Sequence, residues 1–193
     1  MLSSEESLKI LKETKALLEG HFILSSGLHS PKYVQCAQLL SKPDKAELIC
    51  KSLVQKIKKE IDKIDLILSP AMGGIIIGYE IGRLLKTETI FCERVNGSFE
   101  LRRDFHIPKN SKVLIVEDVI TTGKSSLECA EIVKNFHSEI IGYACIIDRS
   151  SNKSEIKNKI VSQIKLNIPT YKKEDLPKEL MSLKAIKPGS RVL

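Results

Sequence analysis

Two adjacent carboxylates, Glu117 and Asp118, follow an apolar segment and lead directly into a polar turn. This turn, residues 121–125, reads Thr-Thr-Gly-Lys-Ser. Hydroxyls and backbone N–H groups at the start of a helix form a ready binding site for phosphate. Two carboxylates beside such a site would repel a bare phosphate, so they are better suited to ribose hydroxyls, with a divalent cation neutralising the anion. The stretch therefore predicts a site for a phosphorylated sugar.

Two other interpretations of this stretch compete with the sugar site. Residues 123–125, Gly-Lys-Ser, match the end of a Walker A loop, but Asp118 stands where that motif requires glycine, so we discard it. Alternatively, the carboxylates only cap the helix that follows, which the hydroxyl-rich turn behind them disfavours.

A glycine-containing turn and three arginines are candidates for binding a diphosphate. Residues 69–74, Ser-Pro-Ala-Met-Gly-Gly, follow another apolar run, and the paired glycines would let backbone N–H groups approach the anion closely. A plain tight turn between a strand and a helix is the alternative. Arg94, Arg102 and Arg103 could clamp the same diphosphate, because guanidinium groups make bidentate contacts with phosphate. For Arg102 and Arg103, a solvated basic face is the alternative.

Two further residues are candidates for contact with another part of the ligand. Arg149 follows a buried strand and should face the crevice at the carboxyl ends of the strands. Tyr33 lies in an extended piece after a Ser-Gly-Leu-His-Ser turn, and it either packs near the ligand or belongs to the core.

Alternating helical and strand patterns must position these residues. Short apolar runs are each followed by a glycine-containing turn and a helix, which predicts an α/β fold with a parallel sheet and helices on both faces. The expected strands are residues 65–68, 89–93, 112–116 and 140–147, and shorter extended pieces are expected at 22–24 and 33–39. Four helices are expected: one over residues 3–19, one that begins at Pro43, one that ends near Leu85, and one over 124–136. Residues 94–111 form one long irregular stretch, and loops of that length are usually functional.

Composition excludes several classes of protein. The 193 residues, 42% hydrophobic and 28% charged, suit one globular domain. No apolar run is long enough for a membrane span, and the acidic N-terminus does not resemble a signal peptide, so we expect a cytoplasmic protein without a membrane partner. The 5 widely spaced cysteines lack a C-x-x-C pair and are expected to be reduced and mostly buried. The net charge of +7 suits nucleic acid or a small anionic substrate, and the lack of nucleic-acid-binding motifs favours the substrate.

Residues 113–125 resemble the phosphoribosyl pyrophosphate (PRPP) signature of the type I phosphoribosyltransferases, in which two acidic residues precede a phosphate loop. Hypoxanthine-guanine enzymes of this family usually place an aspartate where this chain has Thr121, so the resemblance implies a base other than a purine. Other segments look like those of the bacterial orotate phosphoribosyltransferases: residues 20–30, 69–74, 93–94 with 101–103, and 186–191.

This resemblance implies a fold, a reaction and an assembly. The expected fold is a type I phosphoribosyltransferase-like parallel sheet flanked by helices, with a small hood from the N- and C-terminal segments. Residues 1–193 would form a single domain, with the hood at about 1–40 plus 150–193 and the PRPP-binding core at about 41–149. The implied reaction joins orotate and PRPP to give orotidine 5'-monophosphate and pyrophosphate, in pyrimidine (UMP) biosynthesis. Mg²⁺ would be held mainly through PRPP rather than by the protein, and a homodimer would share its active sites.

Roles for individual residues follow from the same resemblance. Arg94, Arg102 and Arg103 on a mobile loop, together with Asp118, are expected to be catalytic. Orotate is expected to contact Thr121, Arg149 and Tyr33. The expected PRPP-binding residues are Arg94, Glu117, Asp118, Val119, Ile120, Thr121, Thr122, Gly123, Lys124, Ser125, Ala71, Met72, Gly73 and Gly74.

The chain also departs from the better-studied orotate enzymes. His29 and Gly73 stand where those enzymes carry lysines, and the loop lacks their lysine- and histidine-rich cluster. The general acid is therefore unassigned, with His106 as a candidate that could equally be a solvated loop residue. Two alternative functions remain open at this point: a regulatory protein of the same fold that binds nucleic acid, and a phosphoribosyltransferase for another base.

Overall fold

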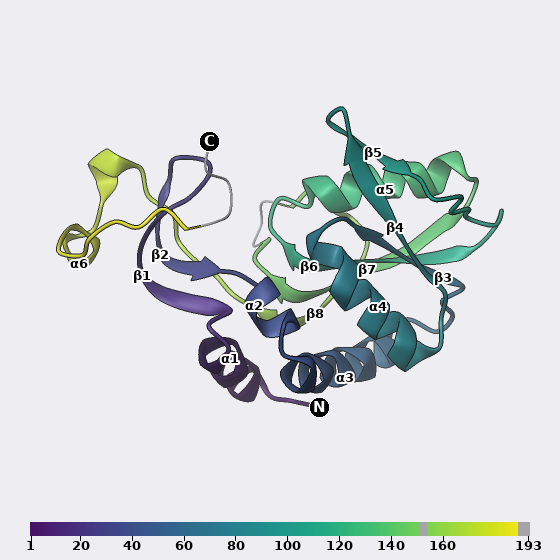
Figure 1. Cartoon of the computed structure of the whole chain (residues 1–193), viewed down its shortest axis with the longest axis horizontal. Helices are drawn as coiled ribbons and strands as arrows, with labels where there is room; N and C mark the ends of the chain where they lie inside the picture. Colours follow the sequence, from purple (N-terminus) through teal and green to yellow (C-terminus); the bar gives the residue numbers. More distant parts are fainter. Residues whose placement is uncertain (151–153, 189–193) are drawn as a thin grey trace.

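A six-stranded, mostly parallel sheet forms the centre of the computed structural model, which describes residues 1–150 and 154–188 (Figure 1). The strand order is β5-β4-β3-β6-β7-β8. The parallel strands are β3 (Leu66–Pro70), β4 (Thr89–Val95), β6 (Lys112–Ile120), β7 (Glu139–Asp148) and β8 (Ile160–Lys165). Strand β5 (Ser98–Leu101) pairs antiparallel with β4 at one edge. The predicted α/β fold with a parallel sheet is confirmed.

Helices cover both faces of this sheet (Figure 1). Helices α1 (Ser4–Glu13), α3 (Pro43–Glu60) and α4 (Gly73–Leu85) pack against one face, and α5 (Lys124–Asn135) packs against the other. Alternate residues of β6 enter the two hydrophobic cores, with Leu114 on the α3 and α4 side and Val113 on the α5 side. Because both faces are buried, the strand reads as a continuous apolar run.

A smaller unit lies beside the main sheet, where an N-terminal ribbon pairs with the C-terminal segment (Figure 1). Strands β1 (Leu17–Ile23) and β2 (His29–Val34) form an antiparallel ribbon. The C-terminal segment adds single bridges to both strands of the ribbon, Phe22 with Ile186 and His29 with Tyr171. Helix α2 (Ala37–Leu40) leads from the ribbon to α3, and the short elements η1 (Lys173–Asp175) and α6 (Lys178–Met181) lie in the C-terminal segment.

Several expected element boundaries were wrong near the N-terminus. The capping box of Ser3 and Glu6 starts α1 as the sequence predicts, but the helix ends at Glu13 instead of residue 19. Lys15 adopts a left-handed φ of 59°, which redirects the chain into β1. The extended piece expected over 33–39 stops at Val34, and its second half is helical.

The stretch 94–111, expected to be irregular, begins as a β-hairpin. Strand β4 continues to Val95, turns at Asn96 and Gly97, and pairs with β5. Ile107 is fully buried, so the return segment is also anchored in the core. Strand β8 was not predicted, and it places residues 160–165 in the main sheet although they lie within the range expected for the hood.

Two further observations concern the C-terminal segment and the helices. The terminal segment 186–191, singled out in the sequence, lies partly outside the described residues. Among the helices of the described ranges, none combines the length and the apolar character that a membrane crossing requires.

Candidate active site

Strand β6 delivers the two acidic residues to the carboxyl edge of the sheet, one on each face. Side chains alternate along a strand, so Glu117 points toward α5 and Asp118 toward α4. The Glu117 carboxylate accepts a 2.5 Å hydrogen bond from the Ser126 hydroxyl on α5. The Asp118 carboxylate accepts a bond of 3.0 Å from the backbone N–H of Val119. The acidic pair therefore bridges the phosphate loop on one side and the turn before α4 on the other.

Burial changes the titration of both carboxyl groups. It raises the pKa of Glu117 to about 7, although the Ser126 hydroxyl partly counteracts this. It also raises the pKa of Asp118, against the lowering effect of backbone hydrogen bonds. Near neutral pH the pair consequently carries less negative charge than two exposed carboxylates, which lowers the cost of placing an anion beside it.

The phosphate loop surrounds a small pocket at the start of α5. The pocket has a volume of about 60 Å³ and is lined by Glu117, Val119 and residues 121–125. Gly123 adopts a left-handed φ of 81° as the residue that precedes α5, and it provides no side chain to cap the helix. The backbone N–H of Lys124 donates to the Thr122 hydroxyl at 3.4 Å, and the other N–H groups of the first helical turn are available to an anion. The volume suits one phosphate group.

The turn 71–74 lies directly against Asp118. The backbone N–H of Ala71 donates to the carbonyl of Cys92 on β4, and the peptide bond between Ala71 and Met72 is cis. A β-carbon on Gly73 would stand 2.8 Å from a carboxylate oxygen of Asp118. The structure therefore brings together two segments more than forty residues apart in sequence, as the hypothesis of a shared PRPP site requires.

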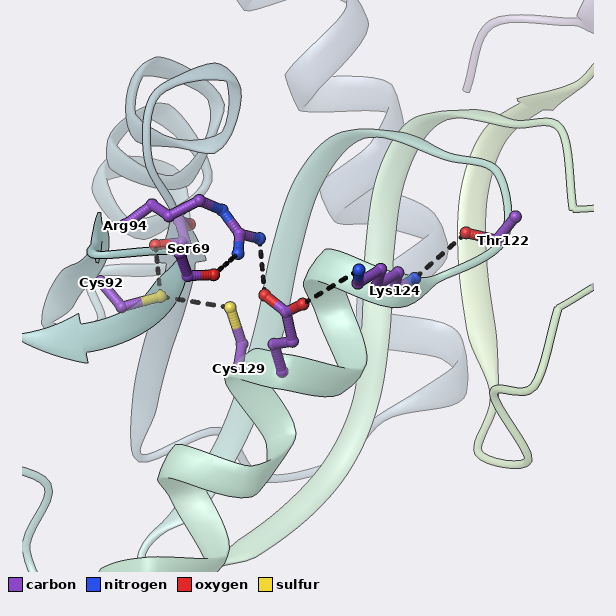
Figure 2. Close-up of polar contacts among 8 residues, drawn as sticks. Ser69, Cys92, Arg94, Thr122, Lys124 and Cys129 are labelled. Atoms are coloured by element: carbon purple, nitrogen blue, oxygen red, sulfur yellow. Dashed lines mark hydrogen bonds and ion pairs between the residues drawn. The ribbon is translucent and has the colours of Figure 1, made fainter. Parts of the chain in front are cut away.

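The three candidate arginines all lie on or after the β4–β5 hairpin, but they point differently. Arg94 extends from β4 toward α5, where it contacts Glu128 at 2.5 Å (Figure 2). Arg103 makes two hydrogen bonds to Glu93 at 2.8 and 3.0 Å. Arg102 is exposed. Within this single chain, Arg94 alone of the three contacts the helix that carries the phosphate loop.

Arg149 is placed beside the phosphate loop with part of its side chain unused. Its backbone N–H donates to the carbonyl of Ile120 at 2.8 Å. Its Nε atom is buried and has no hydrogen-bond partner among the described residues. Burial lowers the pKa of this guanidinium. A buried donor without an acceptor costs free energy, so the geometry suits a ligand that supplies an acceptor.

The remaining candidates differ in what their side chains reach. Thr121 is exposed on the phosphate loop, whereas the side chain of Ile120 is buried in the core and leaves only its backbone near the site. Tyr33 lies on the ribbon, where its hydroxyl donates to Gln35 and its ring packs near Phe22.

Two histidines are placed differently from what the sequence suggested. His106 packs edge-on against Phe136, just after the last turn of α5 and at the end of that helix opposite the phosphate loop. This placement removes it as a general acid for a ligand on that loop of the same chain. His29 is buried and pairs with His21 at 2.6 Å, and His21 in turn contacts the carbonyl of Leu183. His29 therefore ties the ribbon to the C-terminal segment.

Sequence reasoning missed Ser126 and Glu128, which contact Glu117 and Arg94. Both lie on the first turns of α5. Their spacing from the phosphate loop, three and five residues after Gly123, is the signal that could have identified them, since one helical turn spans 3.6 residues.

The site supplies only part of the oxygen donor set that a magnesium ion needs. Mg²⁺ prefers an octahedron of oxygen ligands. Within the described ranges, no three His, Cys, Asp or Glu side chains gather into a cluster that could hold a metal. Glu117 and Asp118 offer carboxylate oxygens on opposite faces of β6, so substrate oxygens and water would have to complete the coordination.

Comparisons with known proteins agree with this geometry. A family model described as "Phosphoribosyl transferase domain" matches residues 35–177. The orotate phosphoribosyltransferase of Parvibaculum lavamentivorans is 46% identical over 191 residues, which is 98% of each chain. That of Methylorubrum populi is 46% identical over 193 residues, covering 100% of this chain and 98% of the relative.

Solved structures support the fold at lower identity. Orotate phosphoribosyltransferase from Aeropyrum pernix superposes with a TM-score of 0.71 at 23% identity, covering 82% of this chain and 92% of that one. UMP synthase from Leishmania donovani superposes with a TM-score of 0.72 at 20% identity, over 86% of this chain and 37% of that longer chain. Because the family model spans most of the chain and its relatives match along their whole length, the chain belongs to the orotate phosphoribosyltransferase family of phosphoribosyltransferases.

Proposed function

We propose that the protein transfers the 5-phosphoribosyl group from PRPP to orotate, giving orotidine 5'-monophosphate and pyrophosphate. The observation that carries this proposal is the buried, unpartnered Nε of Arg149 beside the phosphate loop. Orotate bears a carboxylate, and a guanidinium binds a carboxylate with strong, charge-assisted hydrogen bonds. The phosphate loop and Arg149 together account for both ends of the product.

PRPP would be bound by the two segments that meet at Asp118. The pocket of residues 121–125 holds the 5'-phosphate on backbone N–H groups and hydroxyls. Glu117 and Asp118 accept hydrogen bonds from the ribose hydroxyls. The turn 71–74 and the arginines of the hairpin bind the diphosphate.

Catalysis in this site would consist of positioning and charge stabilisation. As the bond between the anomeric carbon and the diphosphate oxygen breaks, positive charge develops on the ribose and negative charge on the leaving group. The orotate ring nitrogen forms the new bond to that carbon and loses its proton, which the departing diphosphate can accept, so no side chain has to act as a nucleophile. Mg²⁺, when bound with PRPP, neutralises the diphosphate and makes it a better leaving group.

We also propose a homodimer with shared active sites. Met72, Ile76 and Tyr79 form an exposed apolar stripe on and just before α4, with exposed fractions of 83%, 52% and 67%. Their spacing places them on one face of the helix. The stripe begins in the diphosphate-binding turn, and exposed apolar patches commonly mark interfaces. We propose that in this dimer the hairpin of one subunit reaches the site of the other.

Two further parts of the proposal concern architecture and location. The hood, which we place at β1, β2 and the described C-terminal segment, would cover the base-binding end of the site and bring Tyr33 over it. A cytoplasmic location is supported by the cysteines, because all 5 are free and buried.

The assay that tests the function follows orotate depletion in the presence of PRPP and Mg²⁺. We expect turnover with orotate and little or none with uracil, which lacks the carboxylate. If uracil serves as well as orotate, the role of Arg149 is wrong. If neither base reacts, the proposed reaction is wrong.

A further inference from the structure

The guanidinium group of Arg94 makes three contacts within its own chain, of which Figure 2 draws the polar ones. One terminal nitrogen donates to Glu128 on α5 at 2.5 Å. The other donates to the carbonyl of Gly97, at the tip of the hairpin. The group also lies over the ring of Phe99, 4.2 Å from its centroid. These contacts fix the side chain in one orientation although Arg94 is exposed to solvent.

Glu128 connects this arginine to the helix that carries the phosphate loop. Its second carboxylate oxygen lies 4.0 Å from the ammonium group of Lys124, which is the first residue of α5 (Figure 2). The Glu128 side chain is 28% exposed, whereas that of Lys124 is 81% exposed. The tighter and less exposed of the two contacts is therefore the one to Arg94.

We propose that Glu128 is a positioning residue that holds Arg94 ready to bind the diphosphate of PRPP. This inference rests on the proposed function, because it assigns the partner of a diphosphate-binding arginine. Glu128 itself touches no substrate; it acts through the orientation of Arg94.

The physical case rests on conformational freedom. An unrestrained arginine loses side-chain conformational entropy when it becomes fixed on a ligand. Glu128, Gly97 and Phe99 use only part of the guanidinium, so hydrogens on Nε and on the terminal nitrogens remain for phosphate oxygens. Restraint of Arg94 before PRPP binds therefore reduces the entropy lost on binding and still leaves N–H groups free to donate to the diphosphate. This argument holds whether Arg94 serves its own subunit or a partner.

A double-mutant cycle tests whether Glu128 acts through Arg94. We expect Glu128→Ala to lower kcat/KM for PRPP about tenfold, while the KM for orotate at saturating PRPP changes less than about twofold. In a protein that already carries Arg94→Ala, the same substitution should change kcat/KM for PRPP less than about twofold. Glu128→Gln keeps an acceptor oxygen and should recover part of the loss.

Glu131→Ala is the matched control. Glu131 lies one turn further along α5 and pairs with Lys134 on the surface. Its removal should leave all kinetic constants unchanged. Thermal unfolding of every variant separates misfolding from misplacement, since Glu128→Ala is expected to unfold within a few degrees of the wild type.

Three results would overturn the inference. Glu128→Ala could leave kcat/KM for PRPP unchanged, or it could lower kcat/KM equally in the presence and in the absence of Arg94. The third is that the effect of Glu128→Ala disappears in a protein that carries Lys124→Ala but persists in one that carries Arg94→Ala. Calorimetric titration with magnesium pyrophosphate repeats the cycle without turnover, with about tenfold weaker binding expected for Glu128→Ala. An inactive wild type whose pyrophosphate cycle still shows coupling would contradict the proposed reaction alone. If the wild type is active but the effects of Glu128→Ala and Arg94→Ala are additive, only the role of Glu128 is contradicted.

Discussion

Arg149 combines a fixed backbone with a buried side-chain donor that has no partner among the described residues. The donor is its Nε, and the backbone is fixed to the end of β6. A buried donor without an acceptor costs free energy, and a ligand that supplies the acceptor removes this cost. Its position could be predicted from the sequence because it directly follows a buried strand.

Arg149→Ala should raise the KM for orotate about tenfold to a hundredfold, while the KM for PRPP changes little. The lost contact is to the carboxylate of the base, which PRPP does not carry. Steady-state kinetics with each substrate varied in turn measure the difference. Lys165→Ala is the control, because Lys165 is a nearby exposed cation on β8 that lies 3.9 Å from Asp148. Equal effects on both substrates would remove Arg149 from the base site.

The raised pKa of Glu117 makes a second prediction, on stability. Between pH 4.5 and about 7, the folded protein keeps a proton on Glu117 that the unfolded chain releases. The free energy of unfolding therefore falls as pH rises through this window. Glu117→Gln cannot titrate there and keeps an oxygen that can accept from Ser126.

We expect Glu117→Gln to gain stability relative to the wild type as pH rises from about 5 to about 8, by on the order of 1 kcal/mol. Thermal unfolding without substrate at several pH values measures this. Asp118 titrates in both proteins, so its contribution cancels. A stability difference that does not change with pH would show that Glu117 has an ordinary pKa.

At the scale of elements, the roles of consecutive residues could be predicted from the sequence, whereas contacts between segments distant in sequence could not. The strand, acidic pair and phosphate loop occupy consecutive residues, so residues 112–125 reveal their roles in order. The approach of Gly73 to Asp118 depends on how α4 packs on β6, and no local pattern encodes it. The end of α1 was missed because Leu17 and Leu18 continue the apolar pattern after the helix has ended.

The hairpin shows the same limit. Residues 94–101 contain few apolar positions, and the pairing of Arg94 with Phe99 across β4 and β5 creates order that a search for buried strands does not detect. Strand β8 was missed for a related reason, since it pairs with β7 at an edge, and its half-polar sequence Ile-Val-Ser-Gln-Ile-Lys differs from the apolar runs of the central strands.

The contact between the two PRPP-binding segments makes a prediction about glycine. Gly73→Ala would push the Asp118 carboxylate aside, because the new methyl group would otherwise lie 2.8 Å from its oxygen. A side-chain end moves cheaply, so we expect the KM for PRPP to rise about tenfold while the unfolding temperature changes by less than about 2 °C.

Gly82→Ala, further along α4, is the contrasting variant. Its methyl group would meet the backbone carbonyl of Thr87 at 2.9 Å, which cannot move aside as easily. It should lower the unfolding temperature by about 3–10 °C and leave the KM for PRPP unchanged. If Gly73→Ala behaved in the same way, the turn 71–74 would be a structural element only.

At the scale of the whole molecule, the hairpin presents different arginines on its two faces. Cys92 and Arg94 point toward α5, whereas Phe91 and Glu93 point the opposite way. Arg103 follows that second face, held by Glu93 and lying 5.6 Å from the centroid of Phe91. It is thus directed away from the phosphate loop of its own chain, which favours action on a partner's site.

This arrangement predicts complementation between inactive subunits. Arg103→Ala and Asp118→Asn should each give a weak enzyme, because one removes a charge that stabilises the leaving diphosphate and the other an acceptor for the ribose. In a mixed dimer, one of the two sites combines the intact hairpin of one subunit with the intact Asp118 of the other. Random exchange makes half of the dimers mixed, so activity should return to about a quarter of the wild-type value.

Arg102→Ala should be paired with Asp118→Asn in parallel, since Arg102 is exposed and adjacent to Arg103. Subunits that carry two different affinity tags show whether exchange has taken place, and light scattering gives the oligomeric state. A control mixture of Arg103→Ala with Arg102→Ala should recover little, because both defects lie in the same hairpin and one is present at each site. If exchange is complete and neither pairing with Asp118→Asn recovers activity, the hairpin serves the site of its own subunit, and a monomer at assay concentration would contradict the shared site altogether.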